Sequence, residues 1–481
     1  MDTTNNNDVP LVVDLDGTLT KTDLLYESAN YALTRNPFSF FKMVLTLFKG
    51  RGALKSSLSE HFKPQLSELP VNAEVILWLK AEKQRGRKLV LATASHEKLA
   101  QQMSEHFNFF DEVLATSDSR NLKSAIKRDA LVDLYGEKGF DYIGDASADK
   151  PVWKAARYSH AVSPSASVLF WLKKNTLLKN VFKNDSSPIK AFIHALRPHQ
   201  WSKNLLLFVP LLTAHLYTDM QSVWVSLLAF VIFSITASSV YVLNDLVDIT
   251  NDRHHPRKCK RPFASGQLSI LTGWLIWPIL LLLAIISGLL ILPAGFMSVL
   301  CIYYLSTMGY SFYFKRKPLT DVLMLAGLYT LRIIAGTTAL NISPSFWLLS
   351  FSMCMFLSLA FMKRVGEFKT TLTVSNSKQL KGRGYVSGDF ELISSMGVAS
   401  GFLSLVFMAL YIHDQEVIKD YNCPQILWLS CPLLLFWIAR TWLITHRGKM
   451  HDDPVLFAVK DKVSLLTGTL LIFLIIIARY F

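Results

Sequence analysis

The pattern of hydrophobic positions divides the chain into two parts. In the first 155 residues, short apolar runs such as 11–13 and 88–92 end in polar residues and are separated by amphipathic stretches. That pattern is typical of parallel strands joined by helices. From residue 204 onward the apolar runs are long enough to cross a membrane as helices. They lie near residues 204–217, 223–243, 270–291, 294–312, 320–340, 345–362, 391–412, 426–445 and 463–479.

Two further segments fit neither pattern. Residues 22–80 are mostly helical in pattern and lie between the first two strands, where a helical cap would fit. Over residues 156–190 the pattern weakens, and a basic amphipathic stretch at 171–183 is expected to lie on the membrane surface. We therefore predict an α/β domain over 1–155 with a cap over 22–80, and a linker over 156–190. An all-α polytopic membrane bundle of about nine transmembrane helices would follow over 191–481.

Charge follows the same division. Residues 1–150 hold 19 Lys and Arg against 21 Asp and Glu, whereas the rest hold 31 against 15, within a net charge of +14. The basic residues gather in alternate loops, which places those loops and the first domain on the cytoplasmic side of a bacterial inner membrane. With nine spans, Phe481 would lie on the outer side. The basic excess fits lipid headgroups better than nucleic acid.

Neither the cysteines nor the first residues change this picture. The five Cys form no CxxC pair, so the sequence predicts neither a zinc site nor a disulfide framework. Residues 1–10 are polar, and we do not expect a cleaved signal peptide there. Whether the protein forms a homo-oligomer stays open.

Polar residues stand where the strands of the first domain are predicted to end. The carboxyl ends of parallel strands meet at one edge of a sheet, so these side chains would converge. A lysine from a helical segment between two of the strands would add a positive charge. The residues are Asp14, Asp16, Thr93, Asp145 and Asp149, with Lys123 or Lys127 as the lysine.

In this order, DxDGT, a strand-ending Thr, a Lys and GDxxxD resemble the four motifs of the haloacid dehalogenase (HAD) phosphatase superfamily, over roughly residues 9–155. The resemblance implies a HAD-like Rossmannoid fold, with Asp14 as the nucleophile and Asp16 as the general acid and base. Thr93 and Lys127 would hold the phosphoryl group. A carboxylate can attack a phosphate only where metal and ammonium groups offset the repulsion. The residues implied to bind Mg²⁺ are Asp14, Asp16, Asp145 and Asp149.

Three carboxylates close the second long apolar run. Asp245, Asp248 and Asp252 are spaced i, i+3 and i+7, so a helix would place them on one face. Such a face at a membrane edge is costly without a function, and Mg²⁺ takes carboxylates together with substrate phosphate oxygens. Polar residues that could bind a polyanionic substrate follow this motif and gather at other span ends. They are Lys203, Asn204, Asn244, Arg253, Lys258, Arg261, Lys315, Asp321, Arg332, Lys363 and Arg364.

Residues 244–266 read NDxxDxxxDRxHPxKxxRPxASG and resemble the UbiA superfamily of intramembrane prenyltransferases. Aromatic prenyltransferases of that family carry a second DxxxD motif, but Leu325 stands where its second Asp would follow Asp321. RPHQWSKN at 197–204 and YSFYFK at 310–315 are similar instead to the decaprenyl-phosphate phosphoribosyltransferase branch, over roughly 190–480. That resemblance implies Mg²⁺, a polyprenyl phosphate acceptor and phosphoribosyl pyrophosphate (PRPP) as the donor.

Together the two resemblances predict a bifunctional enzyme. The transferase would release pyrophosphate, and the phosphatase would remove the 5-phosphate to give polyprenylphosphoryl ribose for lipid-linked D-arabinofuranose synthesis. Two alternatives stay open: a prenyltransferase with a small or aromatic acceptor beside an independent phosphatase, and an HAD domain that only regulates. Asp321 and Arg332, eleven residues apart on one helix face, could also form a purely structural ion pair.

Overall fold

The computed structural model describes residues 9–45, 56–58, 66–117, 121–183, 187–375, 384–419, 421–450 and 453–480. The chain forms two compact units. The first unit consists of Met1–Leu196 and Val242–Trp277, and the second of Arg197–Tyr241 and Pro278–Phe481. We call Val242–Trp277 the motif segment, because it holds the three aspartates that follow the apolar run. It packs with the N-terminal residues as part of one unit.

The first unit is built on a six-stranded parallel sheet with strand order β3-β2-β1-β4-β5-β6. Its central strand β1 is short and wholly buried, as expected for an apolar strand covered on both faces. Val12 of β1 is aligned with Val90 on one side and Tyr142 on the other. The strands are β1 (Leu11–Val13), β2 (Leu89–His96), β3 (Glu112–Thr116), β4 (Asp141–Gly144), β5 (Ser159–Val162) and β6 (Leu178–Phe182).

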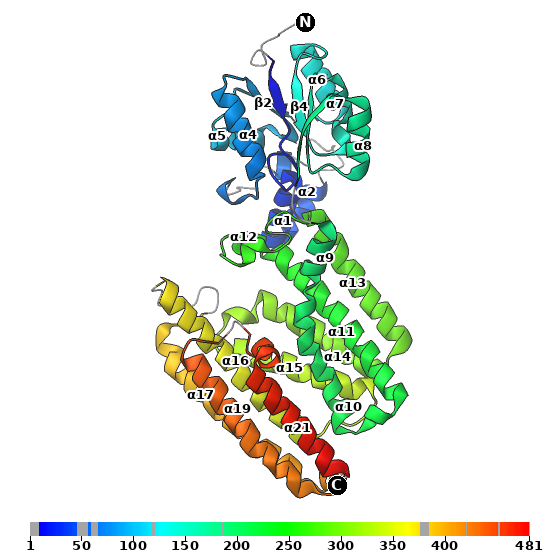
Figure 1. Ribbon diagram of the computed structural model, residues 1–481, viewed down its shortest axis with the longest axis vertical. Helices are drawn as coiled ribbons and strands as arrows, with labels where there is room; N and C mark the ends of the chain where they lie inside the picture. Colours follow the sequence, from blue (N-terminus) through cyan, green and yellow to red (C-terminus); the bar gives the residue numbers. More distant parts are fainter. Residues whose placement is uncertain are drawn as a thin grey trace. The chain divides into compact units, whose positions relative to one another are not determined.

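Helices cover both faces of this sheet. Successive side chains of a strand point to opposite faces, so Leu11 and Val13 pack with α4 and α5, whereas Val12 packs with α6, α7 and α8. Figure 1 shows the two groups of helices on either side of the strands. The helices are α4 (Ala73–Gln84), α5 (Glu97–Phe107), α6 (Ala125–Tyr135), α7 (Lys150–Ala155) and α8 (Ala166–Asn175). The predicted α/β fold of the N-terminal part is confirmed.

The prediction of a linker over 156–190 is wrong. This stretch contains β5, α8 and β6, which complete the sheet. Leu172, in the stretch expected to lie on the membrane surface, packs in the core with Trp153. Lysines such as the exposed Lys179 gave the stretch its basic character, and charged side chains are common on an edge strand like β6. Residues 184–186 of the predicted break lie outside the described residues.

The segment between β1 and β2 is helical, as expected for the cap. It contains α1 (Leu24–Arg35), α2 (Pro37–Leu45) and the short η2 (Leu66–Glu68) before α4. Asp23 caps α1 by accepting from Leu25 N over 2.8 Å. The predicted cap over 22–80 also included the start of α4, but Val75 and Leu79 of that helix pack on the sheet. Residues 46–55 and 59–65 of the predicted cap lie outside the described residues.

Seven helices among the residues described are long and apolar enough to cross a membrane. Two of the nine predicted spans are therefore not supported. Around 204–217 the chain forms η4 (Pro198–Phe208), α10 (Val209–Thr213) and η5 (Leu216–Thr218), each far shorter than a span, because Pro198 and Pro210 interrupt regular helix there. Around 294–312 it forms α14 (Ala294–Phe312), which is not among the seven. The seven segments are Met220–Val247, Ile270–Ile291, Thr320–Ala339, Phe346–Lys369, Ser387–His413, Pro424–His446 and Lys462–Tyr480.

The predicted helical character of the C-terminal part is confirmed, and apolar side chains form its core. Tyr329, Phe361 and Trp442 belong to one buried cluster, and Phe233 and Phe296 belong to a second. The helices that lie wholly in the second unit, besides those named above, are α15 (Thr320–Ala339), α16 (Phe346–Ser375), α17 (Phe390–His413), α18 (Gln415–Ile418), α19 (Ser430–His446), α20 (Pro454–Lys460) and α21 (Lys462–Tyr480). Two helices cross the boundary between the units: α11 (Met220–Val247) and α13 (Ile270–Ile291).

Candidate functional site

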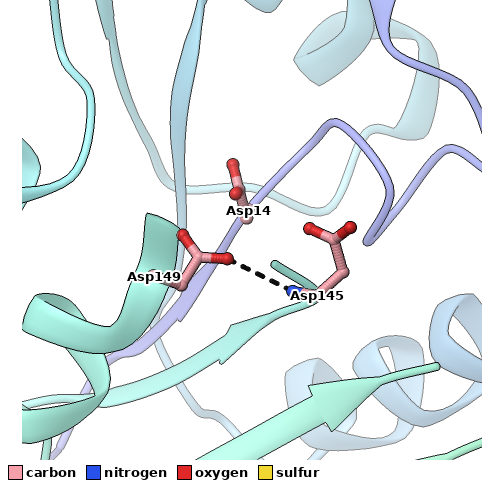
Figure 2. Close-up of side chains that lie close together, drawn as sticks. All are labelled: Asp14, Asp145 and Asp149. Carbon is pink, nitrogen blue, oxygen red and sulfur yellow. Dashed lines mark hydrogen bonds between the residues drawn. The ribbon is translucent and has the colours of Figure 1, made fainter. Parts of the chain in front are cut away.

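An acidic cluster lies at the carboxyl ends of two neighbouring strands. Asp14 directly follows β1, and Asp145 and Asp149 follow β4. Because β1 and β4 are paired in parallel, oxygen atoms of the three carboxylates come within 4.8 Å of one another. Figure 2 shows the three side chains close together. Asp14 N also donates to Ile143 O over 3.0 Å, which fixes Asp14 beside the end of β4. The convergence expected from the strand pattern is present for these three residues.

The turn after β4 sets the position of Asp149. Its Oδ2 accepts from the backbone N–H groups of Asp145 and Ala146, each over 3.2 Å, and the first of these bonds is drawn in Figure 2. Its Oδ1 accepts from the Tyr142 hydroxyl over 2.9 Å. Gly17 closes the other side, because a Cβ atom there would lie 2.2 Å from Asp145 Oδ2. Hydrogen bonds therefore hold Asp149 in place, and Asp145 packs closely against Gly17.

A buried lysine reaches the same cluster. Lys127 Nζ lies 2.9 Å from Asp14 Oδ1 and 3.9 Å from Asp149 Oδ1, with only 3% of its side chain exposed. It also donates to the Tyr142 hydroxyl over 3.1 Å. Lys123 is exposed in the wall of the surrounding cavity. Of the two lysines that the sequence left open, the geometry favours Lys127.

Asp16 accepts hydrogen bonds from several groups, and one of them, the Ser95 hydroxyl, was not predicted from the sequence. Its Oδ2 accepts from the Ser95 hydroxyl over 2.7 Å and from the Thr93 hydroxyl over 3.4 Å. Its Oδ1 accepts from the backbone of Leu24 over 2.8 Å, which ties Asp16 to the start of α1. Thr93 is fully buried and also accepts from Ser95 N over 2.9 Å. Ser95 is a candidate site residue that could have been found from its place at the end of the second strand.

The electrostatics of this cluster favour a divalent cation. Burial raises the pKa of the Asp14 carboxyl to about 7, although Lys127 opposes the shift. Burial, and then the nearby Asp23, raise the pKa of Asp16 to about 6. Burial and the neighbouring Asp149 raise the pKa of Asp145 well above its usual value. Crowded carboxylates with few cations nearby are the donor set that Mg²⁺ takes in proteins, so the residues present fit that ion.

A cavity of about 580 Å³ surrounds the cluster. Its wall combines the acidic residues with apolar side chains such as Leu58 and Leu99, and with Lys21 and Lys123. Two residues of the motif segment, Ser269 and Ile270, also line it. A cavity of this size accommodates a small phosphorylated molecule.

The three aspartates of the motif segment are arranged differently from the sequence prediction. Helix α11 ends at Val247, and Asp248 separates it from the short α12 (Ile249–Arg253), so the aspartates do not lie on one unbroken helix. Asp245 and Asp252 are buried, and Arg261 joins them: its Nη1 lies 3.0 Å from Asp245 Oδ1 and 2.6 Å from Asp252 Oδ2. Within the described ranges, the one set of three or more side chains close enough to hold a metal ion is Asp14, Asp145 and Asp149.

Arg253, predicted to bind substrate, is paired with an acidic residue of α1. Its Nη2 lies 2.6 Å from Glu27 Oε1, its Nη1 donates to Glu27 Oε2 over 3.2 Å, and its Nε donates to Ala264 O. The partners are 226 positions apart, so no local pattern in the sequence indicated this contact. Of the other predicted residues here, Asn244 is half-buried at the end of α11 and Lys258 lies in η6 (Lys258–Lys260).

A first polar network lies inside the second unit. Arg332 Nε donates to Asn204 Oδ1 over 2.9 Å and its Nη2 donates to the Tyr303 hydroxyl over 3.2 Å. Asn204 Nδ2 donates in turn to Ser234 Oγ. Lys203 forms an ion pair with Asp453 and faces the ring of Tyr329. The structure thus brings the predicted residues Lys203, Asn204 and Arg332 together with partners that the sequence did not place.

A second network accounts for Asp321. It pairs with Arg364 of α16, so the alternative of an ion pair between Asp321 and Arg332 is not what the structure shows. Arg364 Nη2 and the Tyr310 hydroxyl both donate to Asp321 Oδ1, the hydroxyl over 3.0 Å. Arg364 also pairs with Glu367. The remaining predicted residues are half-buried: Lys315 in η7 (Phe314–Arg316) and Lys363 on α16.

Comparisons with known proteins found relatives of the whole chain and relatives of its C-terminal part. The model of the UbiA prenyltransferase family matches residues 206–370. An uncharacterized protein, y4nM, from Sinorhizobium fredii is 36% identical over 96% of this chain and 90% of its own length. The decaprenyl-phosphate phosphoribosyltransferase of Corynebacterium glutamicum is 33% identical over 60% of this chain and 86% of its own. A HAD family hydrolase of Salmonella enterica aligns at 14% identity with a TM-score of 0.27, over 36% of this chain and 68% of its own.

Proposed function

We propose, from the premise that this chain belongs to the UbiA prenyltransferase family, that it is a two-step membrane enzyme. In the first step it transfers 5-phosphoribose from PRPP to a polyprenyl phosphate and releases pyrophosphate. In the second, its HAD-like domain removes the 5-phosphate to give polyprenylphosphoryl ribose. The observation that carries the proposal is that one chain combines a transferase half similar to decaprenyl-phosphate phosphoribosyltransferases with the Asp14 cluster.

The polar residues of the transferase half suit the first step. A phosphate oxygen of the lipid attacks C1 of the ribose as the bond from C1 to pyrophosphate breaks, so negative charge builds on the leaving group. Asp245, Asp248 and Asp252 are carboxylates of the kind that hold Mg²⁺, which when bound would neutralise that charge. Arg261 and Lys258 lie in the same segment, and their guanidinium and ammonium groups are of the kind that binds phosphate oxygens. The Leu at position 325 argues against a second metal motif and hence against a prenyl diphosphate donor.

The Asp14 cluster suits the second step. An Asp14 oxygen attacks phosphorus, the bond to the sugar oxygen breaks, and Asp16 gives its proton to that oxygen. Water then attacks the aspartyl-phosphate while Asp16 takes up a proton, which frees inorganic phosphate and restores Asp14. The Ser95 and Thr93 hydroxyls donate to Asp16 Oδ2, which supports a fixed position for this carboxyl in the proton transfer. Lys127 would offset the charge of the incoming phosphate, and the carboxylates would hold Mg²⁺.

The order of the two reactions supports their fusion. The transferase product still carries a phosphate monoester, the kind of group that an HAD phosphatase hydrolyses. The dephosphorylated lipid would serve lipid-linked D-arabinofuranose synthesis. The basic loops support a location in a bacterial inner membrane, with both active sites on the cytoplasmic side and the C-terminus on the outer side.

The proposal is tested with the purified full-length protein, Mg²⁺, PRPP and a polyprenyl phosphate. Wild type should release pyrophosphate and then inorganic phosphate, and Asp245→Asn should release neither. Asp245→Asn should still hydrolyse p-nitrophenyl phosphate, which shows that the phosphatase is folded. Consumption of a prenyl diphosphate in place of PRPP would establish the alternative of a conventional prenyltransferase.

A further inference from the structure

Helix α1 lines the phosphatase cavity with some of its side chains and contacts the motif segment with others. Leu25, Tyr26 and Ser28 of this helix line the cavity around Asp14. Two other side chains of the same helix, Glu27 and Asn30, contact the motif segment instead. Both are almost completely buried, at 4% and 6% exposed. One short helix thus contacts both the phosphatase cavity and the motif segment.

The contacts of Glu27 and Asn30 are specific. Glu27 and Arg253 form a bidentate ion pair, in which two guanidinium nitrogens contact the two carboxylate oxygens. This geometry is stronger than a single hydrogen bond between the two groups. Asn30 Nδ2 donates over 3.0 Å to Leu246 O, a carbonyl in the last turn of α11 that has no partner within its own helix. Trp274 Nε1 of α13 donates over 3.0 Å to Asn30 Oδ1. Asn30 therefore bridges the ends of two helices that are candidate membrane spans.

The chain between these two helices approaches the phosphatase closely. Gly266 has a φ of +73°, and a Cβ atom there would lie 2.7 Å from the Lys21 Cβ. A few residues later, Ser269 and Ile270 form part of the cavity wall. Ile270 is also the first residue of the candidate span Ile270–Ile291. The wall of the phosphatase cavity thus continues directly into a helix apolar enough to lie in the bilayer.

We propose that the phosphatase cavity takes a phosphate monoester carried on a membrane lipid, and that Glu27 and Asn30 are positioning residues that hold the Ser269–Ile270 wall. This inference rests on the proposed phosphatase activity of the Asp14 cluster. A lipid-linked substrate stays anchored in the bilayer, so its phosphate is within reach of a site whose wall borders a membrane-spanning helix. A phosphatase for soluble esters has no need of such a helix in its wall. The apolar residues Leu25 and Ile270 give the cavity a surface that a bare sugar phosphate would not use.

The test compares matched substrates with and without a lipid. The first pair is polyprenylphosphoryl 5-phosphoribose in mixed micelles and free ribose 5-phosphate. The second pair is phosphatidic acid in the same micelles and glycerol 3-phosphate. Release of inorganic phosphate is measured for wild type, Glu27→Gln, Asn30→Ala and Glu105→Gln. Glu105 is an exposed residue of α5 away from the contact and serves as the matched control.

We expect the wild-type kcat/KM to be higher for the lipid substrate of a pair than for its soluble counterpart. Glu27→Gln and Asn30→Ala should lower kcat/KM for that lipid about tenfold, mainly through KM, because a small displacement of a binding wall has effects of this size. Hydrolysis of the soluble member should stay within about twofold of wild type, as should both activities of Glu105→Gln. Replacing both partners, as in Glu27→Arg with Arg253→Glu, should restore part of the preference.

The outcomes separate this inference from the proposed function. Equal hydrolysis of lipid and soluble members in both pairs would overturn the inference. So would a wild-type preference that Glu27→Gln and Asn30→Ala leave unchanged, or an equal loss for both members. A preference for phosphatidic acid with no hydrolysis of the phosphoribose lipid would support the inference and overturn the proposed function. Unchanged hydrolysis of glycerol 3-phosphate reports that each variant is folded.

Discussion

Arg364 Nη2 donates to Asp321 Oδ1 over 2.9 Å, and neither side chain is exposed to any measurable degree. Each residue on its own has the character of a substrate ligand in a membrane enzyme, since isolated buried charges are costly. As a pair, each neutralises the other, and the Tyr310 hydroxyl satisfies the carboxylate further. We therefore assign the pair a structural role that joins α15 to α16.

Removing one member of this pair should destabilise the second unit. Arg364→Met leaves the Asp321 carboxylate buried without its partner, which should cost about 3 to 5 kcal/mol in the free energy of unfolding. Asp321→Leu combined with Arg364→Met removes both charges and should recover most of the loss. Thermal unfolding in detergent measures this, with the exposed Arg316→Met as a control. Full stability of Arg364→Met together with complete loss of pyrophosphate release would instead indicate a role in substrate binding.

Lys127 and Lys123 should differ sharply in the phosphatase reaction. Lys127→Met removes the ammonium group that lies 2.9 Å from Asp14, so the attack on a phosphate dianion loses its nearest positive charge. We expect phosphate release to fall about 10² to 10³-fold. Lys123→Met changes an exposed residue of the cavity wall and should alter the rate by only about twofold. Stopped assays of phosphate release measure both variants. Equal losses in the two would show that the lysine has been assigned wrongly.

Gly17→Ala should abolish phosphate release and spare pyrophosphate release. The added Cβ would lie 2.2 Å from Asp145 Oδ2 and would displace that carboxylate from the acidic cluster. Gly86→Ala is the matched control, because Gly86 has a similar φ of +83° but nothing within 4 Å of the new atom. Both variants should lose about 1 kcal/mol of stability through backbone strain. Only Gly17→Ala should lose the phosphatase, and a similar loss in Gly86→Ala would point to strain alone.

The sequence pattern was sufficient where a contact follows from regular geometry. Asp14 and Asp145 each follow a buried apolar strand, and the carboxyl ends of neighbouring parallel strands meet, so their convergence could be predicted. The pattern was misleading for 156–190, because an edge strand with exposed lysines such as Lys179 has the same composition as a basic surface segment.

Contacts between distant segments could not be predicted in this way. From the sequence alone, several acidic residues are possible partners for Arg253 and for Arg364. Only the packing of the helices pairs Arg253 with Glu27 and Arg364 with Asp321. The aspartate spacing at 245, 248 and 252 suggested one helix face, but α11 ends at Val247 and Arg261 folds back between two of the carboxylates. Tertiary structure decided these cases.

The mass of the lipid product tests the two-step account most directly. Purified protein is incubated with Mg²⁺, PRPP and a polyprenyl phosphate, and the extracted lipid is examined by mass spectrometry. Wild type should yield polyprenylphosphoryl ribose, and Asp14→Asn should yield the same lipid heavier by one phosphoryl group. An identical product from both proteins, or a lipid without ribose, would contradict the account.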